Sequence, residues 1–322
     1  MRHSHAPIIT EIPVADAKDG PYGIAAGPDG ALWLTLAQSG RVARLTTDGE
    51  VTEYPLDSAE CQPTVITPGP DGALWFTRTK DHRIGRISSE GVVRSYPVPT
   101  PDSGPYGITA GPDGALWFTE MNTDKVGRID VEGRVTEFDL PVTGGMPSAI
   151  TTGPDGALWF TLNQANAIGR ITVQGDVTVH PLPTPGAAPV GITSDGAALW
   201  FVEIMAGQIG RITTDGAIQE FPLPDRAAKP HAIVAAGTGD CWFTEWGANR
   251  IGHIIVPEDA ADDAGGHDAT GHGMADHDAT SYDVTIYDLP TPSSEPHGIT
   301  VGPDGALWAA LEIGSIVRLI AS

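Results

Sequence analysis

Cysteine and long apolar runs are scarce in this chain. It contains only Cys61 and Cys241, which lie in different sequence repeats, so we expect no disulfide and a reducing compartment. No stretch approaches the roughly eighteen apolar residues that a membrane-spanning helix needs. The first residues, Met1 to Pro13, also lack the apolar run of a secretory signal peptide. These absences predict a cytoplasmic protein.

Positive charge is also scarce. The chain has 18 Lys and Arg against 41 Asp and Glu, and its formal net charge is −23. Nucleic acids and anionic membrane surfaces are bound by clustered Lys and Arg, so neither partner is expected. We expect a monomer that binds a small molecule.

Glycine and proline are abundant, with 40 and 28 copies, and with 40% hydrophobic residues they favour an all-β protein with many turns. A proline recurs about every 42 residues, and a tryptophan follows each one about twelve residues later. The prolines are Pro21, Pro63, Pro105, Pro147, Pro189, Pro230 and Pro296, and the tryptophans are Trp33, Trp75, Trp117, Trp159, Trp200, Trp242 and Trp308. This period indicates seven structural repeats.

The third repeat shows the pattern within each unit. A strand over 105–109 and a strand over 115–120 flank the turn at 111–114, where Pro and Gly supply the required backbone angles. A third strand is predicted over 125–129 and a fourth over 135–138. Four antiparallel strands in about 40 residues match one blade of a β-propeller.

The two ends of the chain predict how the ring of blades closes. The last repeat stops after its third strand, at 316–319, while 9–13 matches the fourth-strand pattern. The N-terminal strand can therefore complete the last blade and cover the edges that an open array would expose. We predict a single all-β domain over 1–322, a seven-bladed β-propeller with four-stranded antiparallel blades.

One interval breaks the period, because the sixth and seventh opening prolines are about 24 residues further apart than the others. The excess coincides with residues 257–281, an acidic tract of Ala, Asp, Gly and His that cannot build a core. We predict a disordered surface loop between the third and fourth strands of blade six. Its histidines, His267, His272 and His277, are expected to be solvated rather than bound to metal.

The seventh repeat departs from the other six at three positions. Glu295 precedes its opening proline, His297 follows it, and Glu312 comes just after its second strand. The other repeats have no acidic residue at either glutamate position, so the frame does not require one there. Strand alternation predicts that Glu295 and His297 share one face. A regular four-residue turn at 302–305 predicts three facing pairs: Val301 with Ala306, Ile299 with Trp308, and Glu295 with Glu312.

Facing carboxylates, with Cβ atoms about 5 Å apart, repel and destabilise a sheet. A divalent cation would offset this repulsion, and hard oxygen ligands with few protein donors suit Mg²⁺. We therefore predict Glu295 and Glu312 as metal ligands. Glu120, Glu203 and Glu245 come one residue before the Glu312 position in their own blades, and we leave them out of the site.

Histidine follows the opening proline only in the last two blades, as His231 and His297, so both are expected to face the same end of the central channel. Each alone is more consistent with a hydrated channel-lining residue, but the combination with two glutamates favours a site. Tyr22 and Tyr106 occupy the same position in blades one and three, and we expect channel walls that stack against a flat ligand. The repeated tryptophans are predicted to be framework, with Trp246 outside it.

The GPDGALWFTE and IGRI blocks, and above all Glu-Pro-His-Gly with Glu312, resemble the virginiamycin B lyases, also called streptogramin B lyases, from about Ile9 to Ile320. Members of that family are seven-bladed propellers that open the ring ester of type B streptogramin antibiotics by elimination, with Mg²⁺, and so confer resistance. The resemblance implies that His297 accepts the proton and that His231 contacts a cyclic depsipeptide substrate. It also implies that Glu295 and Glu312 bind Mg²⁺. The insertion at 257–281 departs from the family and is expected to lie where it could cover part of the channel mouth.

Two other functions stay open. A metal-dependent lactone hydrolase would add water to the same kind of ester, whereas elimination leaves the mass of the product unchanged. A non-catalytic propeller would bind a ligand or a protein and turn over no ester.

Overall fold

The computed structural model describes residues 7–257 and 282–320, and within them every regular element is a β-strand. The first three blades are built from β2 (Pro21–Ala26), β3 (Leu32–Leu36), β4 (Arg41–Leu45) and β5 (Val51–Pro55); β6 (Pro63–Pro68), β7 (Leu74–Arg78), β8 (Arg83–Ile87) and β9 (Val93–Pro97); and β10 (Pro105–Ala110), β11 (Leu116–Glu120), β12 (Lys125–Ile129) and β13 (Val135–Asp139). Blades four and five are built from β14 (Pro147–Thr152), β15 (Leu158–Leu162), β16 (Ala167–Ile171) and β17 (Val177–Pro181), and from β18 (Pro189–Ser194), β19 (Leu199–Glu203), β20 (Gln208–Ile212) and β21 (Ile218–Pro222).

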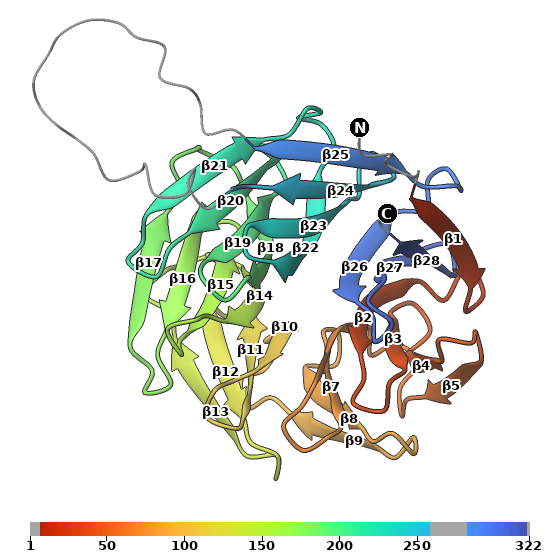
Figure 1. Cartoon of the computed structure of the whole chain (residues 1–322). Helices are drawn as coiled ribbons and strands as arrows, with labels where there is room; N and C mark the ends of the chain where they lie inside the picture. Colours follow the sequence, from red (N-terminus) through yellow and green to blue (C-terminus); the bar gives the residue numbers. More distant parts are fainter. Residues whose placement is uncertain (1–6, 258–281, 321–322) are drawn as a thin grey trace, which may run out of the picture.

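Blade six contains β22 (Pro230–Gly237), β23 (Asp240–Glu245), β24 (Arg250–Ile255) and β25 (Asp283–Asp288). Blade seven contains β26 (Pro296–Val301), β27 (Leu307–Leu311), β28 (Ser315–Ile320) and β1 (Ile8–Pro13). The first strands of successive blades contact one another around a central axis, and β26 contacts β2 to close the ring (Figure 1). The predicted seven-bladed, four-stranded β-propeller is confirmed.

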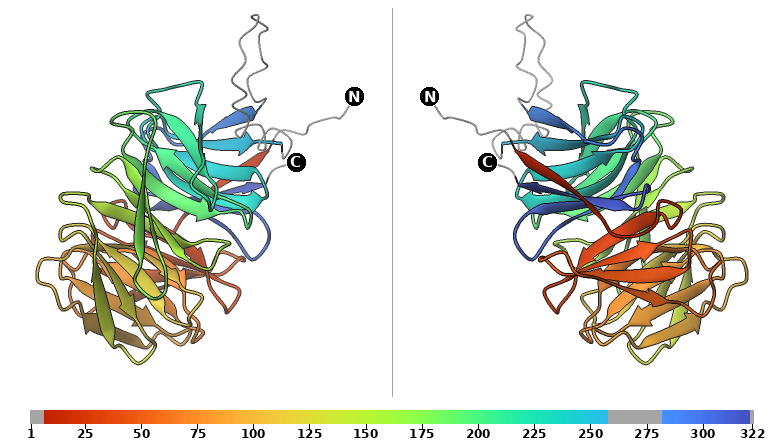
Figure 2. Two further views of the ribbon diagram at one scale, coloured as in Figure 1. Left: turned by 90° about the vertical axis from the view of Figure 1, so that its left-hand side faces the viewer. Right: turned by 90° about the vertical axis from the view of Figure 1, so that its right-hand side faces the viewer.

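The N-terminal strand closes the ring as predicted. β1 pairs antiparallel with β28 from Ile8↔Ile320 to Pro13↔Ser315, so both described ends of the chain lie at blade seven (Figure 2). The backbone N–H groups of Val14 and Ala15 then donate to the carbonyl oxygen of Gly314. The first and last segments of the chain therefore form one blade.

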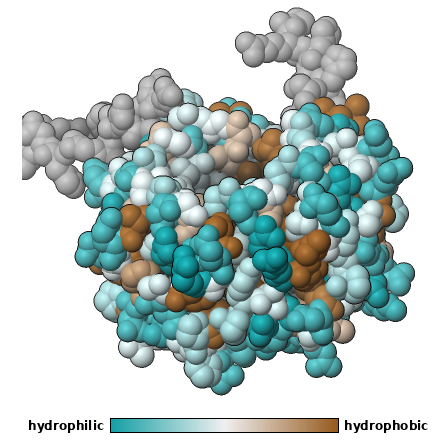
Figure 3. Space-filling view, turned by 90° about the horizontal axis from the view of Figure 1, so that it is seen from below, coloured by the Kyte–Doolittle hydropathy of each residue, from teal (hydrophilic) through white to brown (hydrophobic). Residues whose placement is uncertain are grey.

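Apolar side chains lie between neighbouring blades rather than in one central core. The cluster between blades seven and one, for example, joins Trp308 and Ile316 to Leu34 and Leu45, all nearly inaccessible to solvent. The side of the ring seen in Figure 3 is largely hydrophilic, with separate apolar patches. Each blade is thus stabilised by burying its faces against two neighbours.

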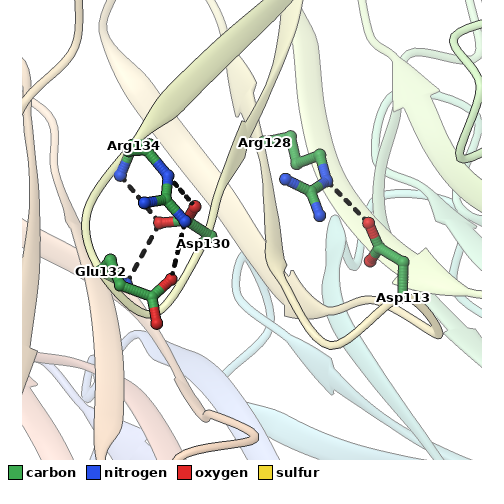
Figure 4. Close-up of polar contacts among 5 residues, drawn as sticks. All are labelled: Asp113, Arg128, Asp130, Glu132 and Arg134. Carbon is green, nitrogen blue, oxygen red and sulfur yellow. Dashed lines mark hydrogen bonds and ion pairs between the residues drawn. The ribbon is translucent and has the colours of Figure 1, made fainter.

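The repeated tryptophans belong to a polar clamp within the blade. In blade three, Trp117 Nε1 donates to Asp113 Oδ1 at 3.1 Å. Arg128 Nε donates to Asp113 Oδ2 at 2.7 Å (Figure 4). Burial opposes ionisation, but these hydrogen bonds lower the pKa of Asp113. The same Asp, Trp and Arg arrangement recurs in blades one, two, four and seven. These tryptophans are framework, as predicted.

Both cysteines are buried free thiols, in agreement with the sequence. Among the described residues we also find no apolar helix long enough to cross a membrane.

The insertion lies between β24 and β25, as predicted, and residues 258–281 fall outside the described part of the chain. Ile255 pairs with both Asp240 and Asp283 at one end of blade six, whereas Pro230 pairs with Glu245 at the other end. The insertion therefore leaves and re-enters the blade at the end remote from His231, which follows Pro230. The expectation that the insertion could cover part of the channel mouth concerns residues outside the described part of the chain.

Candidate functional site

A β-bulge near the start of β26 determines how the seventh repeat presents its polar residues. Pro296 pairs with Leu311, but Ile299 pairs with Ala309, so β26 contains one extra residue between these two pairs. Every other first strand of a blade has the same irregularity after its opening proline. A bulge locally bends its strand, and in blade seven it falls at His297, just after the opening proline.

Two of the three predicted pairings are wrong. Val301 pairs with Leu307 and Thr300 pairs with Trp308, because the turn contains one residue more than the four assumed. The bulge adds one residue to β26 between Pro296 and Ile299. It offsets the extra residue in the turn, so the pairing beyond the bulge returns to the predicted register. Glu312 N donates to Ser294 O at 2.9 Å and to Glu295 O at 3.4 Å, which brings the two glutamates opposite each other as predicted.

Glu295 reaches the site through an unusual backbone conformation. It lies just before β26 and has φ +49°, so strand alternation is not what brings it beside His297. The residue before the opening proline has a positive φ in all seven blades, and it is glycine in two of them, at Gly20 and Gly104. A non-glycine residue in this region costs on the order of 1–2 kcal/mol. Glu295 is therefore held in a strained position that a glycine would occupy more easily.

The structure brings Glu295, His297 and Glu312 together. One ligand atom from each lies within 4.8 Å of the other two, and this is the one such group of three among the described residues. His297 is buried at 7% exposure, and its Nε2 lies 3.8 Å from Glu312 Oε1. The separation is longer than a hydrogen bond, so an ion or a substrate atom can interact with both groups.

The two carboxylates have opposite electrostatic tendencies. The neighbouring Glu312 carboxylate, with burial as the next cause, raises the pKa of Glu295. The neighbouring His297 ring, against the effect of burial, lowers the pKa of Glu312 to about 2, and Glu295 and Gln38 contribute to this shift. Glu312 is thus an anion at all ordinary pH values, and a cation placed between the glutamates would favour the ionised form of Glu295 as well.

The backbone of His297 is fixed from both neighbouring blades. Thr244 Oγ1, in blade six, accepts from Ala232 N and donates to His297 O, both at 3.0 Å. On the blade-one side, a Cβ atom on Gly298 would lie 2.7 Å from the carbonyl oxygen of Tyr22. Glycine at 298 therefore allows β26 to approach β2 closely enough for His297 to enter the channel.

His231 lies beside His297, as predicted from their equivalent positions in adjacent blades. Their ring centroids are 4.8 Å apart with an interplanar angle of 82°. Burial, with a smaller effect of His297, lowers the pKa of His231 to about 3. His231 is therefore neutral near pH 7 and suited to hydrogen bonding rather than to carrying charge.

The channel continues past the histidines into a cavity of about 200 Å³. Its lining includes Tyr22, Tyr106 and His231 together with apolar residues of the first strands, such as Ile24, Ile150 and Ile299. The expectation that both tyrosines are channel walls is confirmed.

Sequence reasoning missed two neighbours of the cluster. Trp246 was recognised only as lying outside the framework, yet its ring centroid is 6.5 Å from His297. Lys229 Nζ lies 5.2 Å from the Trp246 ring centroid, in a cation–π arrangement. Lys229 occupies in blade six the position of Glu295 in blade seven, and Trp246 occupies the position of Glu312. This equivalence could have identified both residues from the sequence.

The three glutamates left out of the site are buried parts of their own blades. Glu120 accepts a hydrogen bond from Thr123, Glu203 from Gln208, and Glu245 from Arg250. All three side chains are inaccessible to solvent. Their hydrogen bonds and burial are those of framework residues.

The fold and this cluster define a seven-bladed β-propeller with two carboxylates and two histidines at one end of its channel. Residues 7–319 match the model of the virginiamycin B lyase family, and the chain belongs to that family.

The chain is similar over its whole length to solved members of this family. It shares 42% identity and a TM-score of 0.86 with a selenomethionine-substituted virginiamycin B lyase from Staphylococcus aureus, covering 98% of this chain and 100% of that one. A catalytically inactive histidine-to-alanine variant of the Staphylococcus aureus enzyme, solved with quinupristin, gives 41% identity and a TM-score of 0.85, with coverage of 98% and 100%.

A curated relative matches over a short stretch. The virginiamycin B lyase of Saccharopolyspora erythraea is 62% identical over 42 residues, which is 13% of this chain and 14% of that protein.

Proposed function

We propose that this protein is a carbon–oxygen lyase that opens cyclic type B streptogramins by elimination at the ring ester, and thereby confers resistance. The observation that carries the proposal is the convergence of Glu295, His297 and Glu312, which differ from the equivalent residues of the other six blades. Two solved relatives named virginiamycin B lyase support it, one of them inactivated by loss of a histidine and crystallised with quinupristin.

Glu295 and Glu312 are the residues that would hold Mg²⁺. The donor set fits a hard divalent cation, because two carboxylates lie close together and Glu312 remains ionised. Bound there, Mg²⁺ would act as a Lewis acid that polarises the ester carbonyl and makes its carboxylate a better leaving group.

His297 acts as the general base. Neither of its ring nitrogens has a hydrogen-bond partner among the described residues, so one is available to take a proton from the carbon next to the one that bears the ester's alkyl oxygen. The electron pair of that C–H bond forms the new C=C bond, and the C–O bond on the β carbon breaks to release a carboxylate. A positioned histidine base commonly contributes roughly 10²- to 10⁴-fold to such a rate.

His231 binds the substrate. Its ring is neutral near pH 7, it lies next to the base, and its Nδ1 is buried without a partner among the described residues. A hydrogen bond to the ring backbone of a cyclic depsipeptide would satisfy that atom. Tyr22 and Trp246 add aromatic surface on either side of His297.

The mass of the product tests the reaction. The full chain is incubated with a type B streptogramin and Mg²⁺, and the products are separated and weighed by mass spectrometry. A linear product with the parent mass and a new double bond is expected. A product heavier by one water would identify the lactone hydrolase instead. Absence of any turnover, with or without a chelator, would indicate a non-catalytic binding protein.

A further inference from the structure

Four aromatic rings meet in the channel beside the proposed base. They come from the position after the opening proline in blades one, three, six and seven, as Tyr22, Tyr106, His231 and His297. Tyr22 lies among the other three: its ring centroid is 4.4 Å from that of His297, 6.1 Å from that of His231 and 6.3 Å from that of Tyr106. The Tyr22 ring therefore connects Tyr106 of blade three to His297 of blade seven.

The two tyrosines are joined by a hydrogen bond across the channel. The hydroxyl oxygens of Tyr22 and Tyr106 are 2.6 Å apart, and either can be the donor. They belong to blades one and three, which are not neighbours in the ring. Leaving a buried hydroxyl without a partner costs stability, so this bond restrains where the Tyr22 ring lies.

The ring of His297 has no comparable restraint from hydrogen bonds. Among the described residues neither of its nitrogens has a hydrogen-bond partner, although many catalytic histidines are oriented by a carboxylate. Its ring instead packs against Tyr22 at an interplanar angle of 31° and against His231 at 82°. Besides Glu312, whose Oε1 lies 3.8 Å from His297 Nε2, the neighbouring rings therefore set the direction in which the base points.

We infer that Tyr106 is a positioning residue: its hydroxyl holds Tyr22, and Tyr22 holds the His297 ring toward the proton that it removes. This inference rests on the proposed function of His297 but adds a residue that does not touch it. Misplacing a catalytic group by about 1 Å can cost on the order of 100-fold in rate, so losing one restraint on the supporting ring should cost less.

Tyr106→Phe tests the inference because it removes one oxygen atom and keeps the ring. We expect kcat to fall about tenfold while KM changes by less than about twofold. Tyr54→Phe is the matched control, since Tyr54 stacks on Trp33 at 5.6 Å in the outer strand of blade one, away from the channel. Equal kcat values for Tyr106→Phe and wild type would overturn the inference.

A double-mutant cycle asks whether Tyr106 acts through Tyr22. If it does, Tyr106→Phe should have no further effect on kcat in a Tyr22→Phe background, because the partner hydroxyl is already gone. If the fold-losses in kcat of the two single variants multiply in the double variant, Tyr106 acts independently of Tyr22. That result would overturn the proposed route.

A measurement that needs no turnover separates this inference from the proposed function. The NMR signal of the His297 ring Cε1–H is assigned by its disappearance in His297→Ala. At constant pH it should shift in Tyr106→Phe and stay in place in Tyr54→Phe. If wild type does not convert streptogramins, the function fails but this measurement still decides the positioning. An unchanged signal in Tyr106→Phe overturns the positioning whatever the activity.

Discussion

Thr244 in blade six donates its hydroxyl proton to the backbone oxygen of His297 in blade seven, at 3.0 Å. Threonines at the same position in other blades make the equivalent bond to the next blade, as Thr119 does to Ser148 O at 2.5 Å. A contact that the propeller uses to join its blades therefore also holds the proposed base. Thr244 is therefore part of both the framework and the support of the site.

Thr244→Val should separate these two roles. Blade five already has Val202 at this position, so valine fits the strand. We expect stability to fall by about 1 kcal/mol and kcat to fall several-fold, up to about tenfold. Thr161→Val is the control, because it removes the same kind of bond in blade four, to Val190 O, and should lower stability with no change in kcat. Equal kcat values for the two variants would show that the Thr244 bond serves only the framework.

Glu295→Gln and Glu312→Gln should each lose activity that extra Mg²⁺ partly restores. Each change removes one anionic ligand and so weakens cation binding. Thermal stability without metal should be kept or rise, since the repulsion between facing carboxylates is relieved. Kinetic titration with Mg²⁺ and melting curves in a chelator measure both effects, with Glu50→Gln in an exposed turn as the control. Wild-type rates for either site variant in EDTA would show that these glutamates bind no required metal.

Much of the fold could be predicted from the sequence because each structural element occurs seven times. The opening prolines, the glycine-rich turns and the tryptophans repeat, so the strands of one blade predicted those of the next. The pairing of β1 with β28 followed from a missing strand at one end and a spare strand at the other. Repetition also made Glu295, His297 and Glu312 visible as departures from six internal controls.

Local geometry at the site could not be predicted in the same way. The bulge in β26 and the positive φ of Glu295 are backbone features that recur in every blade, and no residue type marks them uniquely. Contacts between blades could not be predicted from the sequence either, because the hydrogen bond between Tyr22 and Tyr106 joins residues 84 positions apart.

His297→Ala and His231→Ala should differ in which kinetic constant they change. Removing the proposed base should lower kcat by a factor of about 10² or more and leave KM nearly unchanged. Removing His231 should raise KM more than it lowers kcat, because a neutral hydrogen-bonding contact to the substrate is lost. His180→Ala provides the control, since His180 stacks on Trp159 in the outer strand of blade four. Wild-type kcat in His297→Ala would refute the proposed mechanism.

Deleting residues 1–13 should strongly destabilise the propeller, because β28 would lose its partner strand and blade seven its outer edge. We expect the melting temperature to fall by about 10 °C or more, given about 2–4 °C per kcal/mol for a domain of this size. Deleting only residues 1–6, which stops short of β1, is the matched control. Equal melting temperatures for the two deletions would show that pairing of β1 does not close the ring.

Glu120→Leu should stabilise the protein, and by more as pH rises. Burial, with the neighbouring Glu137 as the next cause, raises the pKa of Glu120 to about 8 from an ordinary value of 4.5. A carboxyl whose pKa is higher in the folded state stabilises the fold fully below pH 4.5, and that stabilisation is lost as pH rises through about 8. The loss amounts to at most about 5 kcal/mol for a shift of this size.

Leucine suits this position because it occupies the equivalent one in blades one, four and seven, as Leu36, Leu162 and Leu311. Melting curves of wild type and Glu120→Leu at pH 5, 7 and 9 should diverge progressively, with the variant more stable at pH 9. Lyase activity at pH 7 should be unaffected, since Glu120 lies inside blade three. The exposed-turn variant Glu132→Gln is the control and should follow wild type closely. A stability difference that is the same at pH 5 and pH 9 would mean that Glu120 titrates normally in the folded protein.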